Sequence, residues 1–343
     1  MNPKQYISVA VVAFVASIVI SACNQPSSTT TSSSPAAPSP NTPQNMASHG
    51  GSHGGDKKIN INGAILSELD KLEAKLGIPA LSNKIQAERP YKTTEELVTK
   101  KIITQAQFDQ IKGQVSIEEV VLTGVEKDTD YMVKLGLMKG HLMVAKELLA
   151  LNRPKDAEPH IGHPVEEIYT DVAEQLTERK VKEFKTTLIT LDDLVKAGAK
   201  DNKKVDGTFK ESMTAIDTAI DALPAAQRQD PKFVLGVING LLDTANSEYG
   251  ASIADGKFKA AIEYQDSRGF ITYVDQLYKG ISAIMTKDHP AEHKVFTDTI
   301  AQLKTAWPAP IPPAAPVKTW PQVTQLVKTI EQSTQKITTV ASN

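Results

Sequence analysis

Cysteine is almost absent: the 343-residue sequence contains a single one, Cys23. One cysteine excludes an internal disulfide framework and any zinc or iron–sulfur site that needs several thiolates. Neither sign of charge is in excess, because 38 Lys and Arg face 40 Asp and Glu. Net charge therefore gives no support to a nucleic-acid binder or an anionic-membrane binder that acts through bulk electrostatics.

Common catalytic motifs are also missing. The sequence has no glycine-rich phosphate-binding loop and no His-Glu-x-x-His zinc-protease motif. The cysteine is not a candidate nucleophile, because its surroundings predict that it carries a lipid. We therefore expect a protein that is not an enzyme and has no catalytic residues.

The N-terminal residues predict a lipoprotein signal peptide, residues 1–22. Lys4 supplies a positive charge, and residues 7–20 are apolar apart from two serines. This stretch is shorter than the roughly 20 residues that span a bilayer, so it indicates a signal-peptide core. It ends in Ile20-Ser21-Ala22-Cys23, which resembles the bacterial lipobox. The resemblance implies cleavage before Cys23 and a lipid anchor on that residue.

The segment after the cysteine predicts how the chain is held at the membrane. Asn24 is not the aspartate associated with inner-membrane retention of bacterial lipoproteins, so the resemblance favours the outer membrane, facing the periplasm or exterior. Residues 23–58 are rich in Ser, Thr and Pro, which predicts a lipid-anchored disordered linker. The expected partners are the membrane, reached through the anchor, and an envelope protein.

Residues 59–122 predict a compact all-helical unit of short helices and tight turns. Their order resembles the tandem helix-hairpin-helix domain of the competence DNA receptor ComEA and the related extrinsic U subunit of photosystem II, PsbU. The matching elements are the Ile-Asn-Ile-Asn-x-Ala opening at 59–64, Glu68-Leu69, Pro79-Ala80-Leu81-Ser82 with Ile85, the turn Arg89-Pro90-Tyr91, and Glu96-Leu97.

This resemblance implies either a DNA-binding or DNA-uptake accessory, or a structural unit that docks a protein partner. DNA-binding members carry glycine turns whose backbone N–H groups approach phosphates. Here the first hairpin keeps only Gly77, and the second, residues 101–104, has no glycine. Residues 56–120 are also neutral, with nine Lys and one Arg against three Asp and seven Glu. Nucleic acid is therefore disfavoured as a partner, and protein docking is preferred.

Residues 124–306 predict an α-helical bundle, and residues 307–343 a Pro-rich linker with a C-terminal helix. Apolar residues recur at helical spacing, and the alternation typical of strands is scarce. No named family is evident for this region. The expected fold class is all-α, with a small helix-hairpin-helix domain followed by a larger bundle. Periodic stretches near the C-terminus cover 232–248, 257–286, 290–306 and 321–341.

Five of the seven histidines fall in this bundle, and three of them predict a metal site. His141 lies at the edge of an apolar stripe, while His160 and His163 stand at a turn into the next predicted helix. Glu167 is four residues past His163, so the two side chains share a helical face. Bundles hold zinc, copper, iron or manganese with such imidazoles and carboxylates. Packed core histidines are the alternative interpretation.

Two further pairs are candidates for the same chemistry. Glu263 and Asp266, in a polar segment of a predicted helix, add oxygen ligands if that face turns inward; the favoured alternative is a solvated face with a glycine kink. His289 and His293 have the i,i+4 spacing that can hold one metal ion, which is also an ordinary surface pattern. The leading hypothesis is a non-enzymatic envelope protein that binds a transition metal in its bundle.

Overall fold

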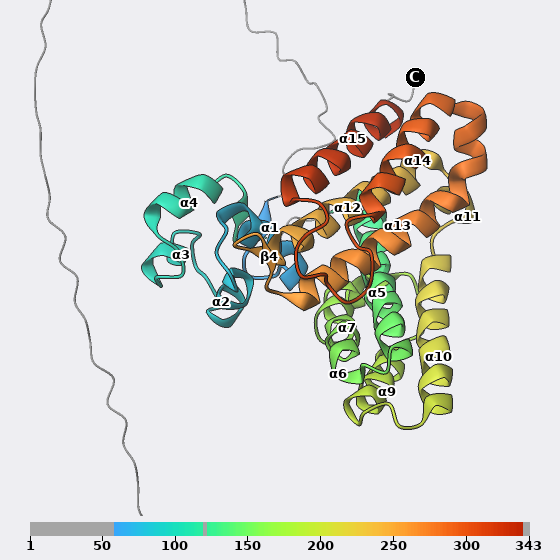
Figure 1. Ribbon diagram of the computed structural model, residues 1–343, viewed down its shortest axis with the longest axis horizontal. Coiled ribbons are helices and arrows are strands. Elements are labelled where there is room, and N and C mark those ends of the chain that lie inside the picture. The colour runs from blue at the N-terminus through green and yellow to red at the C-terminus, as the bar shows by residue number, and fades with distance from the viewer. Residues whose placement is uncertain (1–57, 119–121, 339–343) are drawn as a thin grey trace, which may run out of the picture. The chain divides into compact units, whose positions relative to one another are not determined.

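A computed structural model describes residues 58–118 and 122–338, which all belong to one compact unit of the chain. The predicted signal peptide, Cys23 and nearly all of the predicted linker lie outside the described residues. Regular structure is almost entirely helical, which confirms the prediction of an all-α fold (Figure 1). Among the described helices, none combines the length and apolar character needed to cross a bilayer.

The N-terminal part of the described chain, residues 58–118, has a small hydrophobic core of its own. Two short strands pair in parallel and bring its ends together, with Ile59 opposite Val115. Leu69, Leu81 and Ile111 are fully buried in this core. We call this part the first helical unit. Its elements are β1 (Ile59–Asn60), α1 (Leu66–Leu76), α2 (Leu81–Ala87), α3 (Glu96–Thr99), α4 (Gln105–Ile111) and β2 (Val115–Ser116).

The opening of this unit is tied to its Arg-Pro-Tyr turn by hydrogen bonds. The Asn62 side chain donates to the carbonyl of Tyr91 at 2.8 Å and accepts from its N–H at 2.7 Å. Arg89 donates to the carbonyls of Ile61 at 2.8 Å and Ala64 at 2.5 Å. The residues of both motifs are therefore accounted for by local packing of the unit itself.

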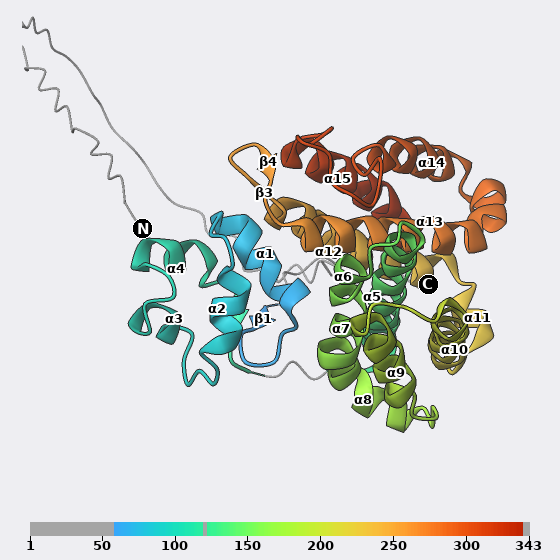
Figure 2. The ribbon, with the colours of Figure 1, turned by 60° about the horizontal axis from the view of Figure 1, so that its bottom comes forward.

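The rest of the described chain is a helical bundle around one larger core (Figure 2). Its longest helices, α5, α12 and α13, pack on one another. The elements are α5 (Gly124–Ala150), α6 (Pro154–Ala157), α7 (Pro159–His163), the π-helical turn η1 (Pro164–Ile168), α8 (Tyr169–Glu178), α9 (Lys185–Lys196), α10 (Asn202–Asp221), α11 (Ala225–Arg228), α12 (Pro231–Ala251), β3 (Ile253–Ala254), β4 (Lys257–Phe258), α13 (Ala261–Asp288), α14 (Pro290–Lys304) and α15 (Trp320–Thr338).

Helices α12 and α13 are joined by a two-stranded hairpin, β3–β4. Asp255 and Gly256 form its turn in the left-handed conformation, with φ of 53° and 68°. An Asp-Gly pair is suited to such a turn because both central residues need positive φ. Helix α13 therefore begins at Ala261, and the helix expected from residue 257 onward starts four residues later.

Helices α5 and α13 touch at two glycines. A Cβ at Gly269 would stand 2.2 Å from the carbonyl oxygen of Gly140, and a Cβ at Gly140 would stand 2.5 Å from the Phe270 ring. Side chains at either position would therefore push the helices apart. The contact brings His141, which follows the first glycine, near Asp266, one turn before the second.

The Pro-rich stretch before α15 lies against α13, and α15 itself packs into the core. Tyr264 Oη donates to the Ala309 carbonyl at 2.8 Å, and Gln265 Nε2 donates to the Pro310 carbonyl at 3.1 Å. Val323 and Ile330 of α15 are fully buried in the main core. The C-terminal helix is thus an integral part of the bundle.

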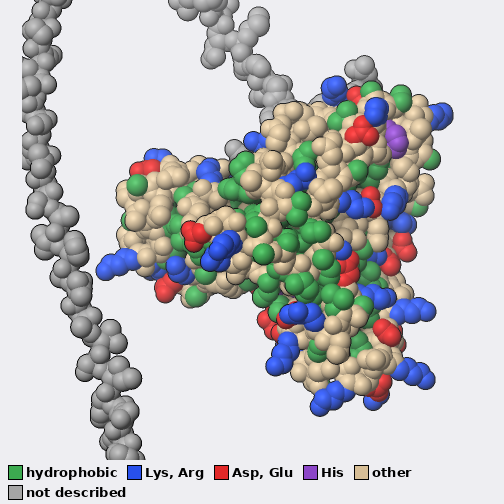
Figure 3. Space-filling model, viewed as in Figure 1, with side chains coloured by type: hydrophobic (Ala, Val, Ile, Leu, Met, Phe, Trp, Pro, Cys, Tyr) green, Lys and Arg blue, Asp and Glu red, His purple; other side chains and the backbone are tan. Residues whose placement is uncertain are grey.

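Acidic and basic side chains are interspersed over the face of the molecule shown in Figure 3, rather than separated by sign. This distribution agrees with the balance of 38 basic and 40 acidic residues in the sequence. That face offers no field of one sign that would attract a polyanion.

Candidate metal centre

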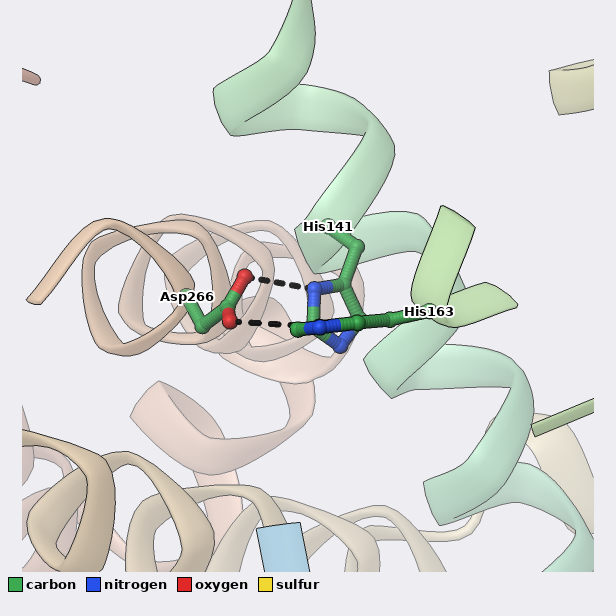
Figure 4. A group of neighbouring side chains, drawn as sticks. All are labelled: His141, His163 and Asp266. Carbon is green, nitrogen blue, oxygen red and sulfur yellow. Dashed lines mark hydrogen bonds and ion pairs between the residues drawn. The ribbon is translucent and has the colours of Figure 1, made fainter. Parts of the chain in front are cut away.

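Three helices bring four of the predicted ligands together inside the bundle. His141 comes from α5, His160 and His163 from α7, and Asp266 from α13; Figure 4 shows three of them. The side chains of His141, His160 and Asp266 are 1%, 0% and 3% exposed, whereas that of His163 is 28% exposed. The cluster is therefore closed on most sides and reaches solvent at His163.

Asp266 lies next to all three histidines of this cluster. Its Oδ1 accepts hydrogen bonds from Nδ1 of His141 at 2.5 Å and Nδ1 of His160 at 2.6 Å. Its Oδ2 lies 3.5 Å from Nδ1 of His163. Burial alone would raise the pKa of Asp266, but its interactions with His141 and His160 outweigh burial and hold it well below its usual range. Asp266 is therefore a carboxylate.

His141 presents a free nitrogen lone pair. Burial lowers the pKa of this imidazole and outweighs the opposing effect of Asp266, so the ring is neutral. Its Nδ1 proton is donated to Asp266, which leaves Nε2 unprotonated. That Nε2 is buried and has no hydrogen-bond partner among the described residues. A neutral imidazole oriented by a carboxylate through its other nitrogen is the usual state of a metal-ligating histidine.

His160, by contrast, uses both ring nitrogens. Its Nδ1 faces Asp266, and its Nε2 lies 2.9 Å from Oε1 of Gln265. The Gln265 amide is oriented in turn by its hydrogen bond to the Pro310 carbonyl. With both nitrogens occupied, His160 positions Asp266 rather than offering a lone pair of its own.

His163 is the most accessible member. Burial lowers its pKa, but the hydrogen bond and charge of Asp266, together with the charges of Glu167 and Glu263, raise it to about 9. The ring is therefore protonated at neutral pH in the metal-free protein. A metal ion at this position would have to displace that proton.

Two predicted carboxylates border the open side, at His163. Glu263 is partly buried, and burial, followed by the charges of Asp266 and Glu73, raises its pKa. Glu167 is held from the first helical unit, because its Oε2 accepts the backbone N–H of Leu66 at 3.1 Å. Both carboxylates are near enough to His163 to affect its pKa.

The polar segment of α13 turns inward, so the interpretation of a solvated face was wrong. Gln265, Asp266 and Ser267 are buried, at 3%, 2% and 0% exposure. Arg268 does not pair with the neighbouring acids; it binds Glu147 of α5 at 2.6 Å. Gly269 permits the close contact with α5 that seats this polar face against the histidines.

His289 and His293 lie apart from this cluster. His289 stands at the junction of α13 and α14. His293 Nδ1 is hydrogen-bonded to the Tyr278 hydroxyl at 3.0 Å, and its ring stacks on that of Tyr278. No third ligand joins this pair among the described residues.

The cluster has donor atoms suited to a transition metal ion. One donor atom each from His141, His163 and Asp266 lie within 4.8 Å of one another. Mixed imidazole and carboxylate donors are compatible with zinc, copper, iron or manganese, and they do not identify which. The unpartnered Nε2 of His141 is the feature that a bound cation would explain.

Sequence reasoning missed the carboxyl pair that lies between α1 and α12. Asp70 and Glu248 are hydrogen-bonded to each other and are 7% and 2% exposed. Burial raises the pKa of Asp70 to about 7, against the hydrogen bond from Ser82, and burial also raises that of Glu248. Asp70 falls on the polar side of the α1 periodicity, so the pattern alone gave no sign that it is buried.

Among known families, the model that matches is the iron permease-associated 4-helix bundle domain, over residues 224–341. This match covers 118 of 343 residues and includes α11 to α15. It contains Glu263 and Asp266, while His141, His160 and His163 precede it. No curated protein and no solved structure matches the chain.

The comparisons correct two predictions. The resemblance to ComEA and PsbU was wrong: no helix-hairpin-helix family is found, and the matched family lies elsewhere, in residues 224–341. The residues of the opening and the Arg-Pro-Tyr turn instead serve the packing of the first helical unit, as with Asn62 and Tyr91. The expectation that no named family covers the C-terminal region was also wrong.

Proposed function

We propose that this protein is a non-enzymatic envelope protein that binds a transition metal ion in its helical bundle. The observation that carries the proposal is the buried, unpartnered Nε2 of His141, whose Nδ1 donates to Asp266. A bare lone pair in a fully buried position is unfavourable unless something coordinates it. A cation bound there would satisfy it.

Iron is the first metal to test. The matched family is described as iron permease-associated, and its segment supplies Asp266 and Glu263 to the cluster. The histidines come from α5 and α7, outside that segment. The site therefore depends on both halves of the bundle.

Each residue of the cluster would have a distinct role in holding the ion. His141 offers Nε2 directly, and His163 offers a nitrogen once its proton has left. Asp266 orients His141 from the opposite ring nitrogen, while His160 holds Asp266 in place. Glu263 and Glu167 border the accessible side and would compensate the positive charge. The ion would be cargo or a regulatory ligand.

The proposed location rests on the sequence of the N-terminus. Lipidation of Cys23 would anchor the protein, with the outer membrane favoured, and residues 24–58 would tether the folded part. Metabolic labelling with a radioactive fatty acid, compared between the wild type and Cys23→Ser, tests the anchor. Equal labelling of the two proteins would contradict it.

Metal analysis of matched variants tests the proposed function. The wild type is loaded with iron(II) under anaerobic conditions, desalted and measured for bound iron, alongside His141→Gln and His163→Gln. We expect about one ion per wild-type chain and a loss of binding in both variants. His293→Gln is the matched control, because that histidine belongs to the same bundle but lies outside the cluster. Iron retained by all three variants, or bound by none of the proteins including the wild type, would contradict a site at this position.

A further inference from the structure

Helix α1 of the first helical unit packs on the bundle beside the accessible edge of the metal centre. Ile65, the residue before α1, is buried in the main core. The Leu66 N–H donates to Glu167, which is one turn past His163. Further along α1, Lys71 forms an ion pair with Asp243 of α12. The contacts of α1 thus begin at the turn that carries a candidate ligand and continue along α12.

The same helix places acidic side chains next to Glu263, the second carboxylate that borders His163. Asp70 and Glu73 of α1 lie near Glu263: the charge of Glu263 adds to burial in raising the pKa of Asp70, and the charge of Glu73 adds to burial in raising that of Glu263. Both carboxylates that border His163 are therefore in contact with, or electrostatically coupled to, the first helical unit. The other members of the cluster are enclosed by the bundle itself.

The first helical unit can separate from the bundle without losing its own core. Leu69, Leu81 and Ile111 pack with one another, in a cluster distinct from the main core. Ile65 is the member of the first unit that belongs to the main core. Units with separate cores open at lower free-energy cost than either unit unfolds.

The interface between the two parts contains groups that favour opening. Asp70 and Glu248 bury two carboxyl groups against each other, with Glu73 and Glu263 nearby. Buried acids are costly, because one of them must keep a proton and the others repel. The Lys71–Asp243 pair is 31% and 52% exposed, and pairs of that kind contribute little. The buried acids therefore oppose docking, and the ion pair adds little to hold it.

We propose that the first helical unit is a movable cover that controls entry and release of the metal ion at this site. When α1 is docked, the N–H of Leu66 at its start donates a hydrogen bond to Glu167, and the helix borders the open edge at His163. When α1 lifts away, Glu167 is released and the edge at His163, which is 28% exposed in the docked state, opens further, so the ion exchanges faster with solvent. This inference rests on the proposed metal-binding function and adds a gate to it.

A reversible crosslink across the interface tests the gate. In the full chain carrying Cys23→Ser, the substitutions Lys71→Cys and Asp243→Cys place the only two thiols on side chains that form an ion pair in the wild type. A short bis-maleimide with a cleavable disulfide joins them after the protein has been loaded with iron(II). Transfer of the bound iron to a coloured chelator is then followed with time. The same double variant without the linker is the matched control.

The crosslinked protein is expected to release iron at least about tenfold more slowly than the control, with the same amount of iron bound. Cleaving the linker should restore the control rate. Ile65→Ser provides a second test in the opposite direction, since it weakens docking and should speed release. Crosslinked and control proteins that release iron equally fast would overturn the gate alone. A wild type that binds no iron would overturn the metal-binding function, and the gate with it.

Discussion

His141 and Asp266 are 125 positions apart in the sequence, yet Nδ1 of the histidine lies 2.5 Å from Oδ1 of the aspartate. The pairing leaves His141 Nε2 as a bare lone pair in a buried position. It depends on the crossing of α5 and α13 at Gly140 and Gly269, where the backbones touch.

Replacing Asp266 by asparagine should weaken metal binding by roughly 10- to 100-fold. The amide keeps the size of the side chain but removes the negative charge that orients His141 and His160. Competition with a chelator of known affinity measures the effect. Asp275→Asn, on the same helix but outside the cluster, where the aspartate pairs with Lys279 and Lys304, is the control and should leave affinity unchanged. Equal affinities for the two variants would contradict the role of Asp266.

His160 and His141 should differ in their effect on binding. His160→Gln removes a residue that positions Asp266, so the affinity should fall while about one ion still binds. His141→Gln removes the free lone pair itself and should abolish the site. Titration with cobalt(II), followed by its visible absorption, gives both stoichiometry and affinity. If His160→Gln abolished binding and His141→Gln only weakened it, His160 and not His141 would be the metal ligand.

Metal binding should release a proton and strengthen as pH rises. Asp266 keeps the pKa of His163 at about 9, so the ring is protonated below that pH and must lose its proton to bind a cation. Apparent affinity should therefore increase about tenfold per pH unit up to about pH 9 and then level off. Isothermal titration in buffers of different ionisation enthalpy counts the protons. A count of zero near neutral pH would contradict coordination by His163.

The glycine contact between α5 and α13 should be needed for stability. Gly269→Ala places a Cβ against the Gly140 carbonyl, and overpacking of this kind typically costs about 1–3 kcal/mol. Gly280→Ala is the matched control on the same helix, because nothing lies within 4 Å of the added Cβ. It should be neutral or stabilise the helix by about 0.5–1 kcal/mol. Urea unfolding of both variants measures the difference, and equal losses would contradict the contact.

Stability should decrease as pH rises through neutrality, because of the carboxyl pair. The pKa of Asp70 is raised to about 7 in the folded protein, from 3.8 in the unfolded chain. The folded state therefore holds a proton that the unfolded state has lost. The resulting stabilisation is complete below about pH 4 and disappears as pH rises through about 7. Glu248, whose pKa is also raised, contributes in the same direction.

Asp70→Asn should remove the part of this dependence that Asp70 causes, since the amide stays neutral at every pH; the raised pKa of His163 adds a decrease of the same sign that the variant keeps. Urea unfolding of wild type and variant at about pH 5.5 and about pH 8.5 measures the change, expected to be roughly 1–3 kcal/mol in the wild type. Asp206→Asn, at an exposed position of α10, is the control and should behave as the wild type. A wild type equally stable at both pH values would contradict the shared proton.

Helical periodicity was sufficient to predict the all-α fold, because amphipathic spacing records which face is buried. It also placed His141 beside an apolar stripe and His160 and His163 at a turn, and the structure brings these three together with Asp266. The inward direction of the α13 polar segment could not be predicted, since a polar face normally indicates solvent. Its burial follows from hydrogen-bond partners 100 or more positions away, such as His160 for Gln265.

Two other features could not be interpreted from the sequence alone, for related reasons. His289 and His293 have the i,i+4 spacing found in pairs of histidines that bind one metal ion. Spacing carries no information about a third ligand, and none joins this pair among the described residues. The motifs that resembled a helix-hairpin-helix domain are short, and the hydrogen bonds of Asn62 and Arg89 account for them within the first helical unit itself. Local patterns predicted elements well and long-range partners poorly.

The separation of His141 from Asp266 also sets an order of events during folding. A chain made from its N-terminus presents all three histidines long before the helix that carries Asp266 exists. Contacts of such high sequence separation form late, because a long loop must close first. The centre therefore assembles only once α13 has docked on α5. An incomplete or truncated chain would carry the histidines without the carboxylate that orients them, so the capacity to retain a metal ion would mark a chain whose folding is complete.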